Sequence, residues 1–224
     1  MQDPEIPPPE PQPAIPWEAL RYFDSHEEIH KTRNNLPHWQ QEGACYFITF
    51  RLGDSLPEAV LAPWREQREA WISIHPKPWN EATQLEYHNR FSHEIDQRLD
   101  EGHGSCPLAE PENARIVADT LRHFDRDRYL LHAWVVMPNH VHLLVSLATQ
   151  TTLEKQIASW KRYSTNAIHH RSGDTGSMWQ KDYFDRMIRD HEHFMKVARY
   201  IEKNPKGLHQ GRFLLYVAPW VGAK

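Results

Sequence analysis

The sequence has 224 residues and is 39% hydrophobic, which is enough to bury one core, so we expect one main domain. No apolar run approaches the roughly 18 residues that a membrane-spanning helix needs, and the acidic, proline-rich start is unlike a signal peptide. We therefore expect a cytoplasmic protein that does not enter a membrane. Cys45 and Cys106 lie far apart, so neither a disulfide framework nor a cysteine-based zinc site is expected.

The net charge of −4 is unevenly distributed along the chain. Residues 1–30 hold seven acids and one base, and the remaining residues have a net charge of +2. Residues 151–212 hold twelve lysines or arginines and seven acids, a local excess of +5 that would suit a polyanion such as a nucleic acid. A solvated helical surface explains the same excess equally well.

Proline dominates the start of the chain, with seven prolines among the first sixteen residues. Proline cannot donate a backbone hydrogen bond, so we expect residues 1–35 to form a mostly flexible acidic extension. The predicted main domain covers 36–215 and contains a helical insertion at 54–125. Residues 216–224 are expected to form a C-terminal tail.

The predicted domain begins with a strand and three helices. Alternating aromatic and β-branched residues predict a strand over 46–51. Ser55 and Glu58 have the spacing of a capping box, which predicts the start of the first helix. Apolar residues three or four apart predict two further helices, over 80–99 and 112–124.

The second half of the domain changes to strand periodicity. The segments "RYLLHAWVVM" and "HVHLLVSL" are apolar and separated by "PN", which predicts an antiparallel hairpin. A capping box at Thr151 and Glu154 predicts the next helix, followed by a short strand at 184–188 and a last helix over 191–203. Together these elements predict an α+β fold in which helices flank an antiparallel sheet.

His140 and His142 open the second hairpin strand. A chain with sixteen histidines should contain about one His-x-His match by chance, so the spacing alone carries little weight. His191 and His193 have the same spacing, but on a helix they point roughly 200° apart. On a strand, His140 and His142 project from one face and could share a metal ion. The alternative is two histidines exposed on a sheet surface.

The last helix supplies two further candidates. Tyr200 and Asn204 are four residues apart, so they lie on one face of that helix, beside its apolar stripe. An amide oxygen could complete a metal site, and a phenol would lie one turn away. The alternative is a packing tyrosine and an asparagine that ends a helix.

The combination of "MPNHVHLLV" and "YIEKNP" resembles the HUH single-tyrosine transposases, and in particular the REP-associated tyrosine transposases. "LPHW" with "YFITFRL", "SWKRYSTNAI" and "MWQKDYFDRMIRD" extend the resemblance over roughly 36–212. It implies a ferredoxin-like HUH nuclease fold in which His140, His142 and Asn204 bind the metal and Tyr200 is the nucleophile. The long helical stretch exceeds the smallest members of the family, and asparagine replaces the glutamine common in mobile relatives.

The resemblance also implies the reaction and its partners. We expect a metal-dependent endonuclease and strand transferase, using Mg²⁺ or Mn²⁺, that forms a 5′-phosphotyrosine link to single-stranded DNA. REP-type palindromic hairpins are the expected substrate, and the protein is expected to be a monomer or a homodimer. Two other functions remain open at this point: a noncatalytic single-strand-binding module, and a metal hydrolase that uses bound water.

Other residues are weaker candidates. Tyr163 and Tyr183 are alternative nucleophiles, but neither has a ligand-type residue four positions later. Trp160 and Trp179 could stack on bases, although the spacing of Trp160 is that of a core residue. Four basic residues could hold phosphates: Lys161, Arg162, Arg186 and Arg189.

Overall fold

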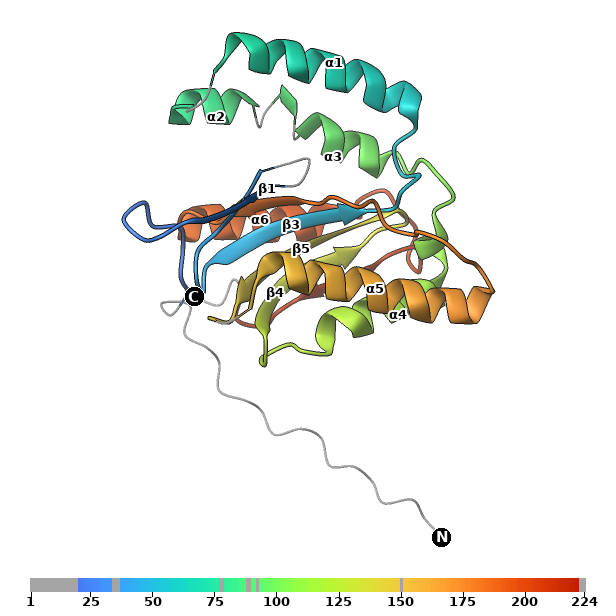
Figure 1. The fold of residues 1–224 in the computed structure, drawn as a ribbon. Coiled ribbons are helices and arrows are strands. Elements are labelled where there is room, and N and C mark those ends of the chain that lie inside the picture. Colours follow the sequence, from blue (N-terminus) through green and yellow to red (C-terminus); the bar gives the residue numbers. More distant parts are fainter. Residues whose placement is uncertain are drawn as a thin grey trace.

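The fold is a five-stranded antiparallel sheet with helices on both faces (Figure 1). The structure is a computed structural model, and it describes residues 20–33, 37–76, 79–87, 90–91, 93–149 and 151–221. The sheet order is β6-β3-β5-β4-β7. The strands are β3 (Cys45–Arg51), β4 (Tyr129–Val136), β5 (His140–Leu147), β6 (Phe184–Met187) and β7 (Leu214–Val217). The predicted α+β fold class is confirmed.

The first four strands of this sheet have the ferredoxin-like order. Across the sheet these four strands follow the order β6-β3-β5-β4. If they are numbered 1 to 4 along the chain, starting at β3, this order is 4-1-3-2. Helices connect β3 to β4 and β5 to β6, so the chain follows a β-α-β-β-α-β path. The predicted hairpin is the β4–β5 pair, and β7, which the sequence did not predict, adds an edge next to β4.

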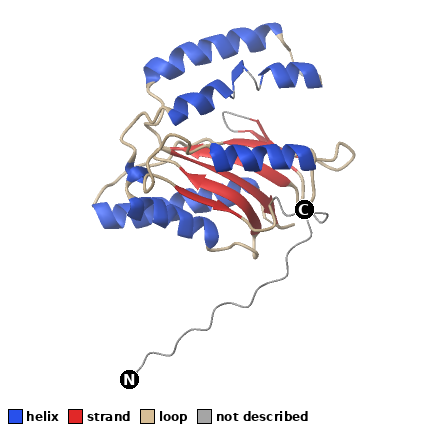
Figure 2. Cartoon of the chain, turned by 180° about the vertical axis from the view of Figure 1, so that it is seen from behind, coloured by secondary structure: helices blue, strands red, loops and turns tan. Residues whose placement is uncertain are grey.

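Two helix layers cover the sheet. Helices α4 (Pro111–Arg122) and α5 (Leu153–Ser172) pack on one face through an apolar core that includes Val117, Leu121, Ile157 and Trp160. Helix α6 (His191–Lys203) covers the opposite face (Figure 2). No helix in the described part of the chain is long and apolar enough to cross a bilayer.

Both predicted capping boxes are wrong. Helix α1 (Glu58–Ile74) follows Pro57, and the buried Ser55 instead donates a hydrogen bond to the carbonyl oxygen of Leu52. Helix α5 follows Thr152, whose side chain makes no cap; the N–H of Leu153 donates to Oε1 of Gln40. A distant side chain therefore satisfies this helix terminus in place of the local pattern.

The first part of the predicted insertion, residues 58–100, forms a separate layer above the sheet (Figure 1), whereas α4 packs on the sheet itself. The predicted helix over 80–99 is wrong, because the segment is divided into α2 (Glu81–Tyr87) and α3 (His93–Asp100), with Arg90 and Phe91 in π-helical conformation between them. Aromatic rings join this layer: Trp71 of α1 lies 5.6 Å from Tyr87 and 5.8 Å from Phe91 between ring centroids. The segment therefore forms two short helices, and the aromatic side chains at their junction pack against α1.

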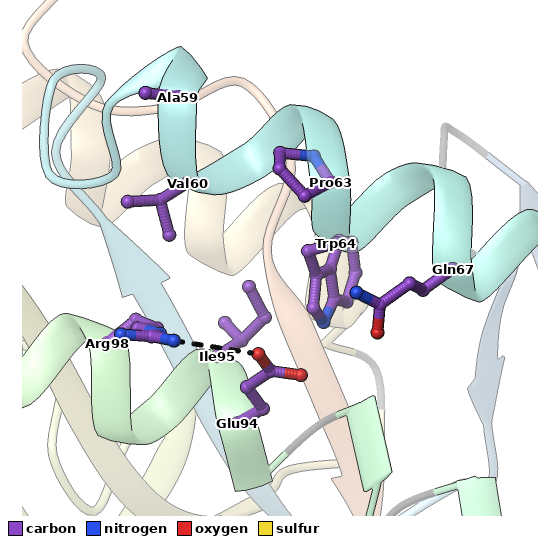
Figure 3. Close-up of a pocket in the computed structure, with 8 residues that line it drawn as sticks. All are labelled: Ala59, Val60, Pro63, Trp64, Gln67, Glu94, Ile95 and Arg98. Atoms are coloured by element: carbon purple, nitrogen blue, oxygen red, sulfur yellow. Dashed lines mark ion pairs between the residues drawn. The ribbon is translucent and has the colours of Figure 1, made fainter.

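A cavity of about 240 Å³ remains between α1 and α3. Figure 3 shows the side chains of Val60, Trp64 and Ile95 pointing into it, with an ion pair between Glu94 and Arg98 at its edge. The Trp64 indole donates a hydrogen bond to the carbonyl oxygen of Phe91, which fixes the ring against α3. The cavity is therefore a partly open cleft between the two helices, lined in part by exposed side chains.

Both ends of the described chain contact the sheet. The N–H of Phe23 donates to the carbonyl oxygen of Ile188, and a short two-stranded sheet joins β1 (His30–Arg33) to β2 (Pro37–Gln40). The predicted extension at 1–35 thus includes β1, while its residues 1–19 and 34–35 lie outside the described part. In the predicted tail, the Trp220 indole donates to Nδ1 of His132.

A buried histidine connects β2 to β6. His38 pairs with Asp185 through Nδ1 and with Asp182 through Nε2, the latter at 3.1 Å. Its ring also stacks on Tyr183, with centroids 4.1 Å apart. Burial opposes the charged imidazolium, but the two carboxylates outweigh it and raise the pKa of His38 to about 9. No local sequence pattern indicates a charged histidine at this position.

The His38 cluster predicts that stability decreases in mild alkali. The folded-state pKa of about 9 lies above the unfolded value of about 6.5, so the contribution is complete below pH 6.5 and is lost as the pH rises through 9. The free energy of unfolding, from urea titrations between pH 6 and pH 9.5, should fall by up to about 1.4 kcal/mol per pH unit. His38→Gln should be less stable and have a flatter profile. The exposed control His209→Gln should keep the wild-type slope, and a flat wild-type profile would contradict the assignment.

Candidate metal and nucleophile site

The alternation of side chains along β5 divides its residues between two environments. His140, His142 and Leu144 project to the α6 face, and the opposite face is wholly apolar. That apolar set packs under α4 and α5 and comprises Val141, Leu143, Val145 and Leu147. Both histidines are fully buried, so they are not exposed on a sheet surface as the alternative interpretation supposed.

The two imidazoles point at each other. Nε2 of His140 lies 3.1 Å from Nε2 of His142. The amide of Asn139 donates through Nδ2 to the carbonyl oxygen of His103, so its Oδ1 accepts from Nδ1 of His140 at 2.7 Å. His140 therefore carries its proton on Nδ1 and has a lone pair on Nε2. Thr49 Oγ1 lies 2.7 Å from Nδ1 of His142 and can accept its proton in the same way.

This arrangement fits a metal ion. Burial lowers the pKa of His140 to about 3, and burial together with His140 lowers the pKa of His142 well below its usual value. Both rings are therefore neutral near pH 7, as metal ligands must be. Bonds of about 2.1 Å at angles between about 90° and 109° place two ligand nitrogens about 3.0–3.4 Å apart. The observed separation lies within that interval.

Helix α6 brings Tyr200 and Asn204 to the same place. The phenol oxygen of Tyr200 lies 3.3 Å from Nε2 of His142 and 3.4 Å from Nδ2 of Asn204. The ring packs edge-on against Phe47 of β3, with centroids 5.8 Å apart, which fixes its direction. Asn204 Oδ1 is buried and has no hydrogen-bond partner in the described structure, so this acceptor is available to a ligand.

Asp100, at the end of α3, is a neighbour of this site that no sequence pattern predicted. Its Oδ1 lies 3.7 Å from Nε2 of His140 and accepts a hydrogen bond from Nδ2 of Asn204 at 3.1 Å. Asp100, His140 and His142 offer three ligand atoms that all lie within 4.8 Å of one another. No sequence pattern connects a residue in the insertion to the hairpin 40 positions later, so only the fold reveals this neighbour.

The site disfavours negative charge as it stands. Burial raises the pKa of the Tyr200 phenol, and the carboxylates of Asp96 and Asp100 add to that effect. Burial also raises the pKa of Asp96 to about 7 and that of Asp100 to about 6. A bound cation would lower all three values, because it stabilises the charged form of each group.

The four predicted phosphate contacts are not brought together. Lys161 on α5 donates to the carbonyl oxygens of residues 180, 181 and 182, so its ammonium group is occupied. Arg162, also on α5, is exposed and lies over the ring of Tyr163. Arg186 is paired with Phe47 across β6 and β3, and therefore faces the same side of the sheet as the histidines. Arg189 is exposed just beyond β6.

The alternative aromatic candidates lie elsewhere. Tyr163 is 55% exposed on α5, and Tyr183 is buried against His38. The indoles of Trp160 and Trp179 are buried and donate to Tyr129 Oη and Ser164 Oγ, so neither is free to stack on a base. None of these four side chains hydrogen-bonds to His140 or His142 in the described structure.

Comparison with known proteins agrees with the motifs. The family described as "Transposase IS200 like" matches residues 114–204, a segment that contains His140, His142, Tyr200 and Asn204. The resemblance to the single-tyrosine transposases is thereby confirmed. The matched segment begins at residue 114, within the predicted insertion at 54–125, and so leaves out Asp100.

Two solved structures are matched at low sequence identity. One is a REP-associated tyrosine transposase bound to a REP hairpin, 15% identical, with a TM-score of 0.44 over 77% of this chain and 73% of that chain. The other is a proposed transposase from Deinococcus radiodurans R1, 12% identical, with a TM-score of 0.29 over 81% of this chain and 97% of that chain. No curated protein matches the sequence.

Thr49 provides a test of the imidazole geometry. Thr49→Val keeps the shape of the side chain but removes the partner of His142 Nδ1, so His142 loses its orientation. Because residues that orient a metal ligand usually contribute about 10–100-fold to affinity, the dissociation constant for Mn²⁺, measured by isothermal titration calorimetry, should rise by about that factor. The control Thr120→Val removes a hydroxyl that only donates to the Ile116 carbonyl, and should leave binding unchanged. Equal affinity in both variants would show that Thr49 does not orient the ligand.

Proposed function

Because residues 114–204 match the IS200-like transposases, we propose that this protein is a metal-dependent single-stranded DNA endonuclease and strand transferase. The observation that carries this proposal is the convergence of a phenol with two facing imidazoles: Tyr200 Oη lies 3.3 Å from Nε2 of His142. The proposed nuclease domain covers 36–215, with the helical insertion at 54–125.

Tyr200 is the proposed nucleophile. Its phenol oxygen attacks the phosphorus of a phosphodiester and forms a 5′-phosphotyrosine link, while the bond to the 3′ oxygen breaks. The released 3′ oxygen takes up a proton, which balances the one that the phenol loses. The link retains the energy of the phosphodiester bond, so a second 3′-hydroxyl can attack it and join two strands without ATP. This reversibility is what makes the reaction a strand transfer.

His140, His142 and Asn204 are the proposed metal ligands. A divalent ion held there supplies charge neutralisation at a nonbridging phosphate oxygen. Two imidazole nitrogens with oxygen donors suit Mn²⁺, and Mg²⁺ accepts the same set with more water. The unpartnered, buried Oδ1 of Asn204 supports its part in this set. The same cation would favour the phenolate of Tyr200, which burial alone disfavours.

The proposed substrate is a REP-type palindromic hairpin. The motif resemblance to the REP-associated transposases supports this choice, and the solved relative was bound to a REP hairpin. Of the four basic residues proposed to contact phosphates, Arg162 and Arg189 are exposed. Arg186 lies on the histidine face of the sheet, and its buried Nε has no hydrogen-bond partner in the described structure. Lys161 could contribute only by giving up its carbonyl partners.

A covalent-adduct assay tests the reaction. The full chain is incubated with labelled single-stranded hairpins and Mn²⁺ or Mg²⁺, then separated under denaturing conditions. Wild-type protein should carry the label, because the phosphotyrosine bond survives denaturation. Tyr200→Phe, which lacks only the attacking oxygen, should form no adduct. Tyr163→Phe is the matched control, since it removes an exposed phenol outside the site, and it should behave as wild type.

Three results would contradict the proposal in different ways. Binding without cleavage by the wild type would indicate a noncatalytic binding module. Cleavage that survives Tyr200→Phe would indicate a hydrolase that uses bound water. An adduct lost in Tyr163→Phe and retained in Tyr200→Phe would move the nucleophile to α5.

A further inference from the structure

We propose that Asp100, supplied by the helical insertion, is an anionic ligand of the metal ion. This inference rests on the proposed function, because it concerns the ion that His140 and His142 would hold. It adds a carboxylate from α3, which lies outside the matched segment 114–204, to ligands that come from the sheet and α6. The helical insertion thereby becomes part of the site.

The distances from His140 Nε2 to Asp100 and to His142 fit ligands of one ion, and the three ligand atoms all lie within 4.8 Å of one another. Bonds of about 2.0–2.2 Å place any two ligand atoms of one ion between about 3.0 and 4.4 Å apart, depending on the angle between them. Nε2 of His140 lies 3.7 Å from Asp100 Oδ1 and 3.1 Å from Nε2 of His142. Two histidines and one carboxylate are also a recurring ligand set for divalent metals that keep open positions.

The charge balance favours a carboxylate. His140, His142 and Asn204 are all neutral donors, so a divalent ion among them would keep its full charge in a buried site. A buried charge without a counter-charge costs several kcal/mol, and one carboxylate removes half of the imbalance. The open positions remain for the scissile phosphate, which would supply the rest.

Asp100 is held in position by contacts other than the histidines. Nδ2 of Asn204 donates to its Oδ1 at 3.1 Å, and thereby joins the end of α3 to the end of α6. Arg98, the basic residue in the last turn of α3, pairs with Glu94 and Glu101, so it does not neutralise Asp100. The carboxylate is therefore directed at the site by a neutral amide.

The loop after α3 is fixed to the β4–β5 turn. Asn139 Nδ2 donates to the carbonyl oxygen of His103, and the N–H of Leu108 donates to the carbonyl oxygen of Pro138. The residue that orients His140 is thus also the residue that holds this loop. These contacts fix the end of the insertion at the start of β5, where the histidines lie.

Metal affinity distinguishes Asp100 from its neighbours. Mn²⁺ is titrated calorimetrically into the full chain, in the wild type, Asp100→Asn and the matched control Glu101→Gln. Glu101 is the adjacent acid and pairs with Arg98 and His103 on the surface, so its loss removes a nearby charge without removing a ligand. Asp100→Asn should raise the dissociation constant at least about tenfold, and Glu101→Gln should leave it within about twofold. Circular dichroism confirms that each variant is folded.

A spectroscopic measurement separates ligation from a general electrostatic effect. With Co²⁺ in place of Mn²⁺, the visible absorption bands depend on which atoms coordinate the ion. Asp100→Asn should change the position and intensity of these bands at saturating Co²⁺, and Glu101→Gln should not. Unchanged bands and an unchanged Mn²⁺ affinity in Asp100→Asn would overturn the inference.

Two further results separate this inference from the proposed function. Wild-type protein that binds no Mn²⁺ would overturn both. Binding that is lost in His142→Ala but equal in wild type and Asp100→Asn would overturn only the role of Asp100. Cleavage that becomes faster in Asp100→Asn would also overturn it, because the carboxylate would then be occupying the position of the phosphate.

Discussion

The site depends on two buried imidazoles whose Nε2 atoms face each other at 3.1 Å. The strand period of two sends both rings to one face of β5, and the same period sends four apolar side chains to the other face, under α4 and α5. A shift of one residue in the pairing of β5 would exchange the two faces and place the histidines in the apolar core. The register of β5 against β3 and β4 is therefore what fixes the chemistry, since it sets Thr49 opposite His142.

The parts of the fold that sequence reasoning found are those in which local pattern and tertiary packing agree. Strand 46–51 alternates, the β4–β5 hairpin consists of two apolar runs around a short turn, and the last helix has apolar residues three or four apart. The prediction failed where a distant group replaced a local one. Gln40 satisfies the first turn of α5 where Thr151 was expected to do so, and aromatic packing on Trp71 accompanies the division of 80–99 into two helices.

The residues of the candidate site also fall into two groups: those that local periodicity predicts and those that only the tertiary fold brings close. His140 with His142, and Tyr200 with Asn204, are pairs within single elements, so the period of each element is sufficient to place its two members side by side. Asp100 could not be found by this route, because its approach to His140 depends on how the insertion folds back over the sheet. Basic residues were the least informative class. Lys161 is a basic residue in the basic segment of the chain, as a phosphate contact would be. Its ammonium group nevertheless donates hydrogen bonds to three backbone carbonyl oxygens.

Burial and charge together explain why the proposed nucleophile and the proposed ion would share one site. The phenol of Tyr200 is surrounded by protein and by the carboxylates of Asp96 and Asp100, and each of these raises its pKa. Such a phenol would remain protonated and would be a poor nucleophile in the absence of metal. A cation at the imidazoles would reverse the local electrostatics, since it would neutralise the carboxylates and favour the phenolate at the same time. In our proposal, Tyr200 therefore becomes reactive only when the ion that positions the phosphate is also present, so that one binding event controls both halves of the reaction.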